Sequence, residues 1–110
     1  MNKMPSGEVV VSAVAGRIAR LLCDDASAEN RLLDLGFSKE NDALVKVIND
    51  DSERRSLVKD LIDMNAIFVR GREWSPAELL DYYREQGFSL GSYRTIEWRD
   101  PATFHISTEV

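Results

Sequence analysis

His105, the one histidine of the chain, is the residue best suited to acid–base chemistry near neutral pH. It lies in the segment 92–110, SYRTIEWRDPATFHISTEV, where two alternating runs flank Asp100 and Pro101. If the runs pair as a hairpin whose loop has three or five residues, Glu97 lies opposite His105. Because charged cross-strand pairs stabilise sheets without any catalytic role, we expect this pair to be a surface feature. A hydrolase or isomerase built around the pair is the alternative.

Other residues that carry catalysis or bind metals are sparse. Cys23, in the apolar run IARLLC, is the one cysteine, and the neighbouring Asp24 and Asp25 disfavour a reactive thiolate. One cysteine and one histidine do not make a zinc site, and the acidic segment 49–53, NDDSE, lacks the glycine of a calcium loop. The chain has neither a Walker A loop nor a GxGxxG motif. We therefore predict no catalytic residues, no metal site and no cofactor.

Four arginines in or beside the predicted strands are candidates for contact with an anion or a nucleic acid: Arg70, Arg72, Arg94 and Arg99. A helix followed by a ribbon and a basic wing would resemble a winged-helix arrangement, which makes a nucleic-acid-binding regulator our alternative function. The net charge of −5 disfavours phosphate-backbone binding, and the helix before the ribbon carries Asp81 and Glu85. Binding to an anionic membrane is disfavoured for the same reason.

Exposed tyrosines predict a protein-binding surface instead, because tyrosine is enriched in interface cores. Tyr82 falls opposite the apolar stripe of its predicted helix, and Tyr93 falls on the outward side of the hairpin. With Glu97 and His105 they form our predicted partner-binding site. We predict a small, acidic, non-enzymatic protein that acts by binding another protein, as an adaptor, inhibitor, immunity or regulatory protein. The edge of the last strand, 103–110, also favours pairing with another chain, and hence a homo-oligomer.

Size and composition set the class of protein. The 110 residues, 44% of them apolar and 30% charged, fit one domain over 7–110 that follows a flexible leader over 1–6. No apolar run approaches the roughly 20 residues that span a bilayer. The beginning of the chain is not a convincing signal peptide. We therefore expect a cytoplasmic protein with no membrane partner.

Apolar spacing predicts three or four helices in the first two-thirds of the chain. The segment 10–22 shows one helical stripe of five apolar residues, although the β-branched triplet 9–11 at its start could instead be extended. A short piece from Ser27 ends at Gly36, a typical helix stop. The stretch 39–64 reads as either two helices or one kinked helix. Within 74–88, Ser75 and Glu78 form a capping box, with Pro76 at the first helical position and Trp74 set to pack on Leu79 as a hydrophobic staple.

The last third completes the predicted fold. The apolar run 66–69, next to Gly71, indicates a buried strand, although it could instead extend the preceding helix. In the hairpin, the Ile, Trp, Phe and Val residues are all even-numbered, so the even side should point inward onto the helices and the odd side should point outward. We therefore predict a single α+β domain with three to four N-terminal helices, then a strand, a helix and a C-terminal antiparallel hairpin packed on the helices. The expected core comprises Ile18, Leu22, Leu44, Ile48, Leu61, Ile62, Leu79, Tyr83, Ile96, Trp98, Phe104 and Ile106.

Overall fold

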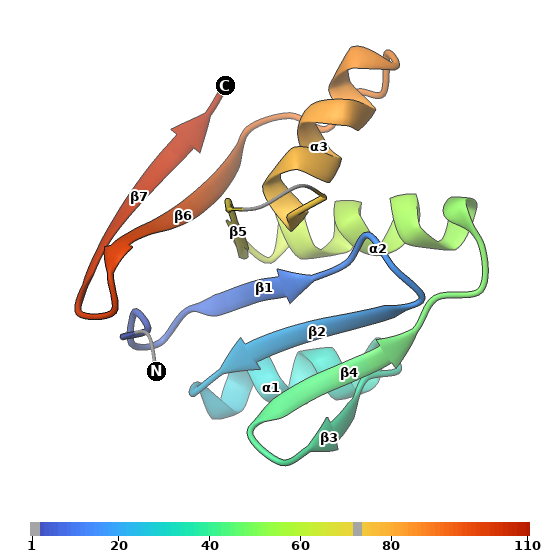
Figure 1. Ribbon diagram of the computed structural model, residues 1–110. Helices are drawn as coiled ribbons and strands as arrows, with labels where there is room; N and C mark the ends of the chain where they lie inside the picture. The colour runs from blue at the N-terminus through green and yellow to red at the C-terminus, as the bar shows by residue number, and fades with distance from the viewer. Residues whose placement is uncertain (1–2, 72–73) are drawn as a thin grey trace.

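A mixed β-sheet is the frame of the protein. The computed structural model describes residues 3–71 and 74–110, in which three helices and seven strands occur (Figure 1). The strand order is β3-β4-β2-β1-β5-β6-β7, with β1, β5 and β6 mutually parallel and every other neighbouring pair antiparallel. Along the chain the elements are β1 (Val9–Ala13), β2 (Ile18–Cys23), α1 (Ala26–Asp34), β3 (Ser38–Glu40), β4 (Ala43–Val47), α2 (Asp51–Asp63), β5 (Ile67–Val69), α3 (Pro76–Glu85), β6 (Tyr93–Asp100) and β7 (Thr103–Glu109).

The predicted helix over 10–22 is wrong, because this segment forms the antiparallel strands β1 and β2. Its residues also satisfy the two-residue period of a strand: Ala19 and Leu21 are buried, whereas Arg20 is exposed. The β-branched run at the start of the segment favours extended backbone, and this preference prevails. Ile18, which the helical stripe placed in the core, is 53% exposed.

The predicted helix within 39–49 is also wrong, because strands β3 and β4 occupy this segment. Asn41, with φ of 55°, supplies the left-handed residue that the tight turn between them requires. Leu44 and Ile48 are buried, as expected, but they reach the core from an extended chain. Only the second half of 39–64 is helical, as α2, whose first turn is capped by Asp50 accepting a hydrogen bond from the Glu53 N–H at 2.8 Å.

The predicted fold class, three to four N-terminal helices followed by a strand, a helix and a hairpin, is therefore contradicted, because the described residues form one mixed sheet with strands toward both ends of the chain. Several individual elements nevertheless lie where they were predicted. The short helix α1 ends at Gly36, where φ is 101° and the Phe37 N–H donates to the Leu32 carbonyl at 3.1 Å. Strand β5, helix α3 and the terminal hairpin lie where the sequence placed them. The predicted capping box of α3 is not formed, because Ser75 makes no side-chain cap bond and the Glu78 carboxylate accepts the N–H of Trp74, the residue before the cap, at 3.2 Å.

The register of the hairpin agrees with the prediction from residue parity. Trp98 lies opposite Phe104, and Glu97 lies opposite His105. An irregularity between Trp98 and Asp100 lets β6 pair further, so that the turn itself is shorter than the predicted loop. Asp100 accepts a hydrogen bond from the Ala102 N–H at 2.9 Å, which stabilises this turn.

The three helices pack on one face of the sheet and bury the main core. Buried residues of α1, α2 and α3 form one cluster with side chains from β1, β2, β4, β5 and β6. On the opposite face a smaller cluster centres on Val10, Ile67 and Ile96 and includes no residue of the described helices. Met4 packs against this second cluster.

Packing on both faces of β6 overturns the prediction that the even side of the hairpin packs on the helices. Tyr93 and Thr95, both odd-numbered, are buried on the helical side. Trp98, Phe104 and Ile106 lie on the other side and are half-buried. The reason is that β6 is an interior strand, paired with β5 as well as β7, so helix α3 covers the beginning of its odd side.

Candidate functional site

The most exposed aromatic pair of the described chain lies on the outer side of α3. Trp74, just before the helix, is 53% exposed, and Tyr82, two turns along it, is 43% exposed. Their rings meet edge to face, with centroids 5.7 Å apart and planes at 74°. Because adjoining aromatic side chains are seldom left exposed to water, this pair is a candidate contact site.

Trp74 adopts a backbone conformation that a bulky residue rarely takes. Its φ is 61°, in the left-handed region, where such a residue costs on the order of 1–3 kcal/mol. The Glu78 carboxylate helps to hold this conformation by accepting the Trp74 N–H at 3.2 Å. This hydrogen bond and the contact between the two rings therefore offset the strain and keep the indole beside Tyr82 on the surface.

Carboxylates surround the aromatic pair. A shallow hollow of about 300 Å³ is lined by Trp74, Glu78, Asp81, Tyr82 and Glu85, and we call these five residues the α3 surface. The spacing is helical, so all five lie on one side of α3. The α3 surface thus combines two aromatic faces with three negative charges.

One network anchors α3 to the sheet beneath this surface. The Tyr93 hydroxyl on β6 donates to Asp81 at 2.6 Å, and the Arg70 guanidinium donates to the same carboxylate at 3.0 Å. Burial opposes ionisation of Asp81, but these two hydrogen bonds outweigh it and lower the pKa of its carboxyl. Burial, together with the Asp81 carboxylate, raises the pKa of Tyr93 to about 12.

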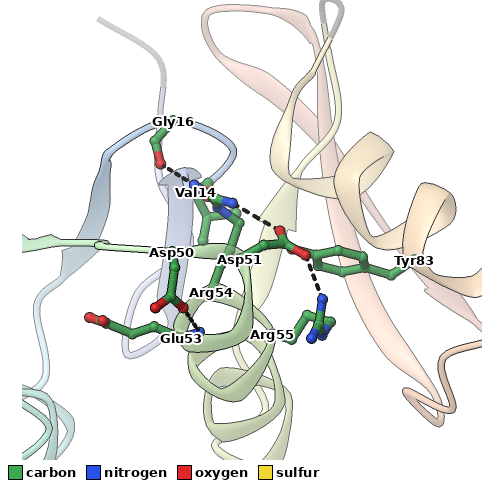
Figure 2. Close-up of polar contacts among 8 residues, drawn as sticks. All are labelled: Val14, Gly16, Asp50, Asp51, Glu53, Arg54, Arg55 and Tyr83. Atoms are coloured by element: carbon green, nitrogen blue, oxygen red, sulfur yellow. Dashed lines mark hydrogen bonds and ion pairs between the residues drawn. The ribbon is translucent and has the colours of Figure 1, made fainter.

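A second network anchors α3 to the first turn of α2 (Figure 2). The Tyr83 hydroxyl donates to Asp51 at 2.7 Å, and guanidinium groups of Arg54 and Arg55 donate to the same carboxylate at 2.9 and 2.6 Å. The hydrogen bond from Tyr83 is the main cause that lowers the pKa of Asp51. Burial and the Asp51 carboxylate raise the pKa of the Tyr83 hydroxyl to about 12.

Arg54 extends the second network to the turn between β1 and β2. Its Nε donates to the Val14 carbonyl at 3.0 Å and its Nη2 to the Gly16 carbonyl at 2.9 Å (Figure 2). One guanidinium thus satisfies two backbone acceptors and pairs with Asp51. Helix α3 is therefore tied through Tyr83 to α2 and, through Arg54, to the first hairpin.

The structure separates the four predicted partner-binding residues. Tyr82 is exposed, as predicted, but Tyr93 is 3% exposed, so the prediction that it points to solvent is wrong. Its position faces α3, which covers the odd side of β6 there. Glu97 and His105 are both exposed on the hairpin, whose turn extends away from α3 (Figure 1).

Two of the predicted arginines are paired with carboxylates on opposite faces of the sheet. Arg70 lies on the helical side, between Asp81 and a Glu109 carboxylate oxygen at 3.5 Å. Arg94 follows the helix-facing Tyr93 along β6, so it points to the other side of the sheet, where it donates to Glu8 at 2.5 Å. These two guanidinium groups therefore do not form one basic patch.

Of the remaining two arginines, only Arg99 belongs to the part of the chain that the structure describes. Arg99 is exposed beside the irregularity of β6, near the hairpin turn. Arg72 lies outside the described residues. The predicted anion or nucleic-acid contact therefore gains no geometric support.

Of the five residues of the α3 surface, only Tyr82 was predicted as a site residue, and Trp74 is the aromatic residue among those that were missed. It was expected to pack on Leu79 as a hydrophobic staple, but its ring lies against Tyr82. The signal was present in the spacing, because Trp74, Glu78 and Tyr82 recur every fourth residue and so lie on one side of a helix. That stripe is polar and aromatic rather than aliphatic, which distinguishes it from a core face.

The thiol of Cys23, the possible metal ligands and the comparisons with known proteins do not point to another site. Cys23 is half-buried, and burial raises the pKa of its thiol. Within residues 3–71 and 74–110, no group of three or more histidine, cysteine or acidic side chains is placed to hold a metal ion, and no helix is long and apolar enough to cross a membrane. The chain matches no protein-family model, no curated protein and no solved structure.

Proposed function

We propose that the protein acts by binding another protein and that the α3 surface contacts a basic segment of that partner. The exposed Trp74–Tyr82 pair is the observation that carries the proposal, because large aromatic side chains provide much of the binding energy at protein interfaces. The networks through Tyr83 and Tyr93 support it further. They hold α3 in place before a partner arrives, which lowers the entropy cost of binding.

The chemistry of the α3 surface selects a cationic partner. Glu78, Asp81 and Glu85 surround the aromatic pair, and the chain as a whole carries a net charge of −5. An arginine or lysine of the partner can stack on an aromatic face and pair with a carboxylate at the same time. Within the protein, Asp81 already pairs with a guanidinium, that of Arg70.

A fluorescence titration tests the proposal directly. In a Trp98→Phe background the emission reports on Trp74, because the chain has only these two tryptophans. Titration with a short arginine–glycine repeat peptide should change this emission, whereas a glutamate–glycine peptide of equal length should not. In a calorimetric titration of the same peptide, Trp74→Ala and Tyr82→Ala should each weaken binding by roughly two- to fivefold, the worth of an exposed cation–π contact.

A matched pair of charge reversals separates the α3 surface from the general acidity of the chain. Glu85→Lys should weaken binding of the arginine peptide, whereas Glu40→Lys, an equal charge change at an exposed position of β3, should have a much smaller effect. Equal binding of the two peptides, or unchanged affinity in both alanine variants, would refute the proposal.

A further inference from the structure

Strand β7 leaves one edge of the sheet open. Of the described strands it neighbours only β6, and Figure 1 shows it as the outermost strand on that side. It is seven residues long, TFHISTE, and carries no lysine, arginine or proline. Its one carboxylate, on Glu109, is at the end of the strand and faces Arg70. The unpaired N–H and C=O groups of such a strand are a template for another strand.

The opposite edge of the same sheet shows how an edge is protected. Strand β3 has three residues, SKE, all exposed, of which Lys39 and Glu40 are charged. Short length and charge are the usual means by which proteins prevent pairing at an edge. Strand β7 has neither protection, so the two edges of the sheet differ in kind.

We infer that β7 pairs antiparallel with β7 of a second copy of this chain. The two-fold axis that relates the copies passes midway between their His105 residues, which lie opposite each other. Such an axis stands perpendicular to the sheet, so each residue must face one of its own parity. With His105 on the axis, Phe104 of each copy lies opposite Ile106 of the other, and Thr103 lies opposite Ser107. The two sheets then become one continuous sheet.

Complementarity of the side chains favours this register over its neighbours. It creates two aromatic–β-branched pairs, the kind of cross-strand pair that stabilises sheets most. An axis through Ile106 would place Phe104 against Thr108 and bring Thr103 against Glu109. In a single chain the Phe104 and Ile106 side chains are only half-buried, and they lie on the sheet face that no described helix covers. Pairing therefore buries apolar surface that is exposed to water in the monomer.

Sedimentation of the purified chain over a range of concentrations tests the inference. We expect a reversible monomer–dimer equilibrium. His105→Lys should raise the dissociation constant by roughly fivefold, because two like charges then face each other across the axis. Glu97 lies opposite residue 105 within each chain, so the introduced lysine remains compatible with the folded monomer. Ser38→Lys, on exposed edge β3, adds the same charge at the other edge and should leave the dimer unchanged.

Disulfide trapping tests the register. In a Cys23→Ser background, His105→Cys should form an intermolecular disulfide on mild oxidation, since paired antiparallel residues have Cα atoms roughly 4.5–5.5 Å apart. A chain that stays monomeric at all concentrations, or a dimer that His105→Lys leaves unchanged, would overturn the inference. A dimer that is trapped by Ile106→Cys but not by His105→Cys would overturn the register. Both experiments are independent of the arginine-peptide titration, so the two proposals stand or fall separately.

Discussion

The two tyrosines that anchor α3 predict a loss of stability at alkaline pH. Tyr83 and Tyr93 are each buried, and each donates its hydroxyl hydrogen to a carboxylate, that of Asp51 or Asp81. Ionisation of either phenol would remove the donor and place a second negative charge beside the carboxylate. Burial of the phenol, and then these two effects of the carboxylate, raise the pKa of the folded-state hydroxyl above its ordinary value of 10.0, to about 12 in each case.

The size of the effect follows from linkage between protonation and folding. Because the folded-state pKa is raised, the stabilisation is fully present below pH 10 and is lost as the pH rises toward about 12. Two pKa units correspond to roughly 2.7 kcal/mol for each tyrosine, and hence to roughly 5 kcal/mol for the two together. Since small domains are stable by about 5–15 kcal/mol, this loss is enough to bring the protein close to unfolding.

Urea unfolding followed by circular dichroism, from neutral pH in steps to about pH 12, measures this loss. Tyr83→Phe and Tyr93→Phe should each be less stable than the parent at neutral pH, because each lacks a hydrogen bond to a charged group, worth about 1.5–3 kcal/mol. Each variant should then lose about half as much stability as the parent between pH 10 and about 12. Tyr82→Phe, which removes an exposed phenol from the same helix, controls for the substitution itself. A parent protein whose free energy of unfolding stays constant across this pH interval would refute the reasoning.

Two further predictions concern the caps and the strand assignment. Asp50→Ala should lower the free energy of unfolding by about 1 kcal/mol, because Asp50 caps α2. Ser75→Ala should be neutral or stabilising, because the buried Ser75 hydroxyl has no hydrogen-bond partner among the described residues. Paired urea denaturation curves compare the two variants, and an equal loss of stability in both would contradict the difference. Leu21→Ala should lower the free energy of unfolding by about 2–5 kcal/mol and Ile18→Ala by much less, since of these two residues only Leu21 is buried. Thermal unfolding measures both losses, and similar losses in the two variants would contradict the position of β2 in the sheet.

The sequence predicted those elements that carry explicit start and stop residues. Pro76 and Gly87 bound α3, Gly36 ends α1, and the parity of residues 93–110 determined the hairpin register. The segment 10–22 was misassigned because five apolar residues fit a helical stripe and an alternating strand almost equally well. Over so short a length, periodicity alone does not choose between the two. Tertiary pairing decides instead, since β1 and β2 lie inside a sheet whose other strands come from residues far along the chain.

The candidate site was predicted in part for the same physical reason. Tyr82 was identified because a helix has one exposed side, and that argument needs only local spacing. Tyr93 was misplaced because the side of β6 that meets α3 depends on the connection from β5 through α3 to β6, a parallel crossover that parity within a hairpin does not reveal. Trp74 was missed because its left-handed backbone turns the ring away from the predicted staple and onto Tyr82.

The two anchoring networks also limit how the α3 surface can respond to a partner. Asp81 belongs both to that surface and to the network with Arg70 and Tyr93. A cationic partner side chain that approached Asp81 would therefore compete with Arg70 for the Asp81 carboxylate. Glu85 is not a member of either anchoring network described above, so a cation that pairs with Glu85 meets no such competition. The aromatic pair and Glu85 can accept a guanidinium without disturbing the attachment of α3 to the sheet. For this reason the contact proposed for the α3 surface is centred on Trp74, Tyr82 and Glu85, with Asp81 contributing charge but not a direct bond.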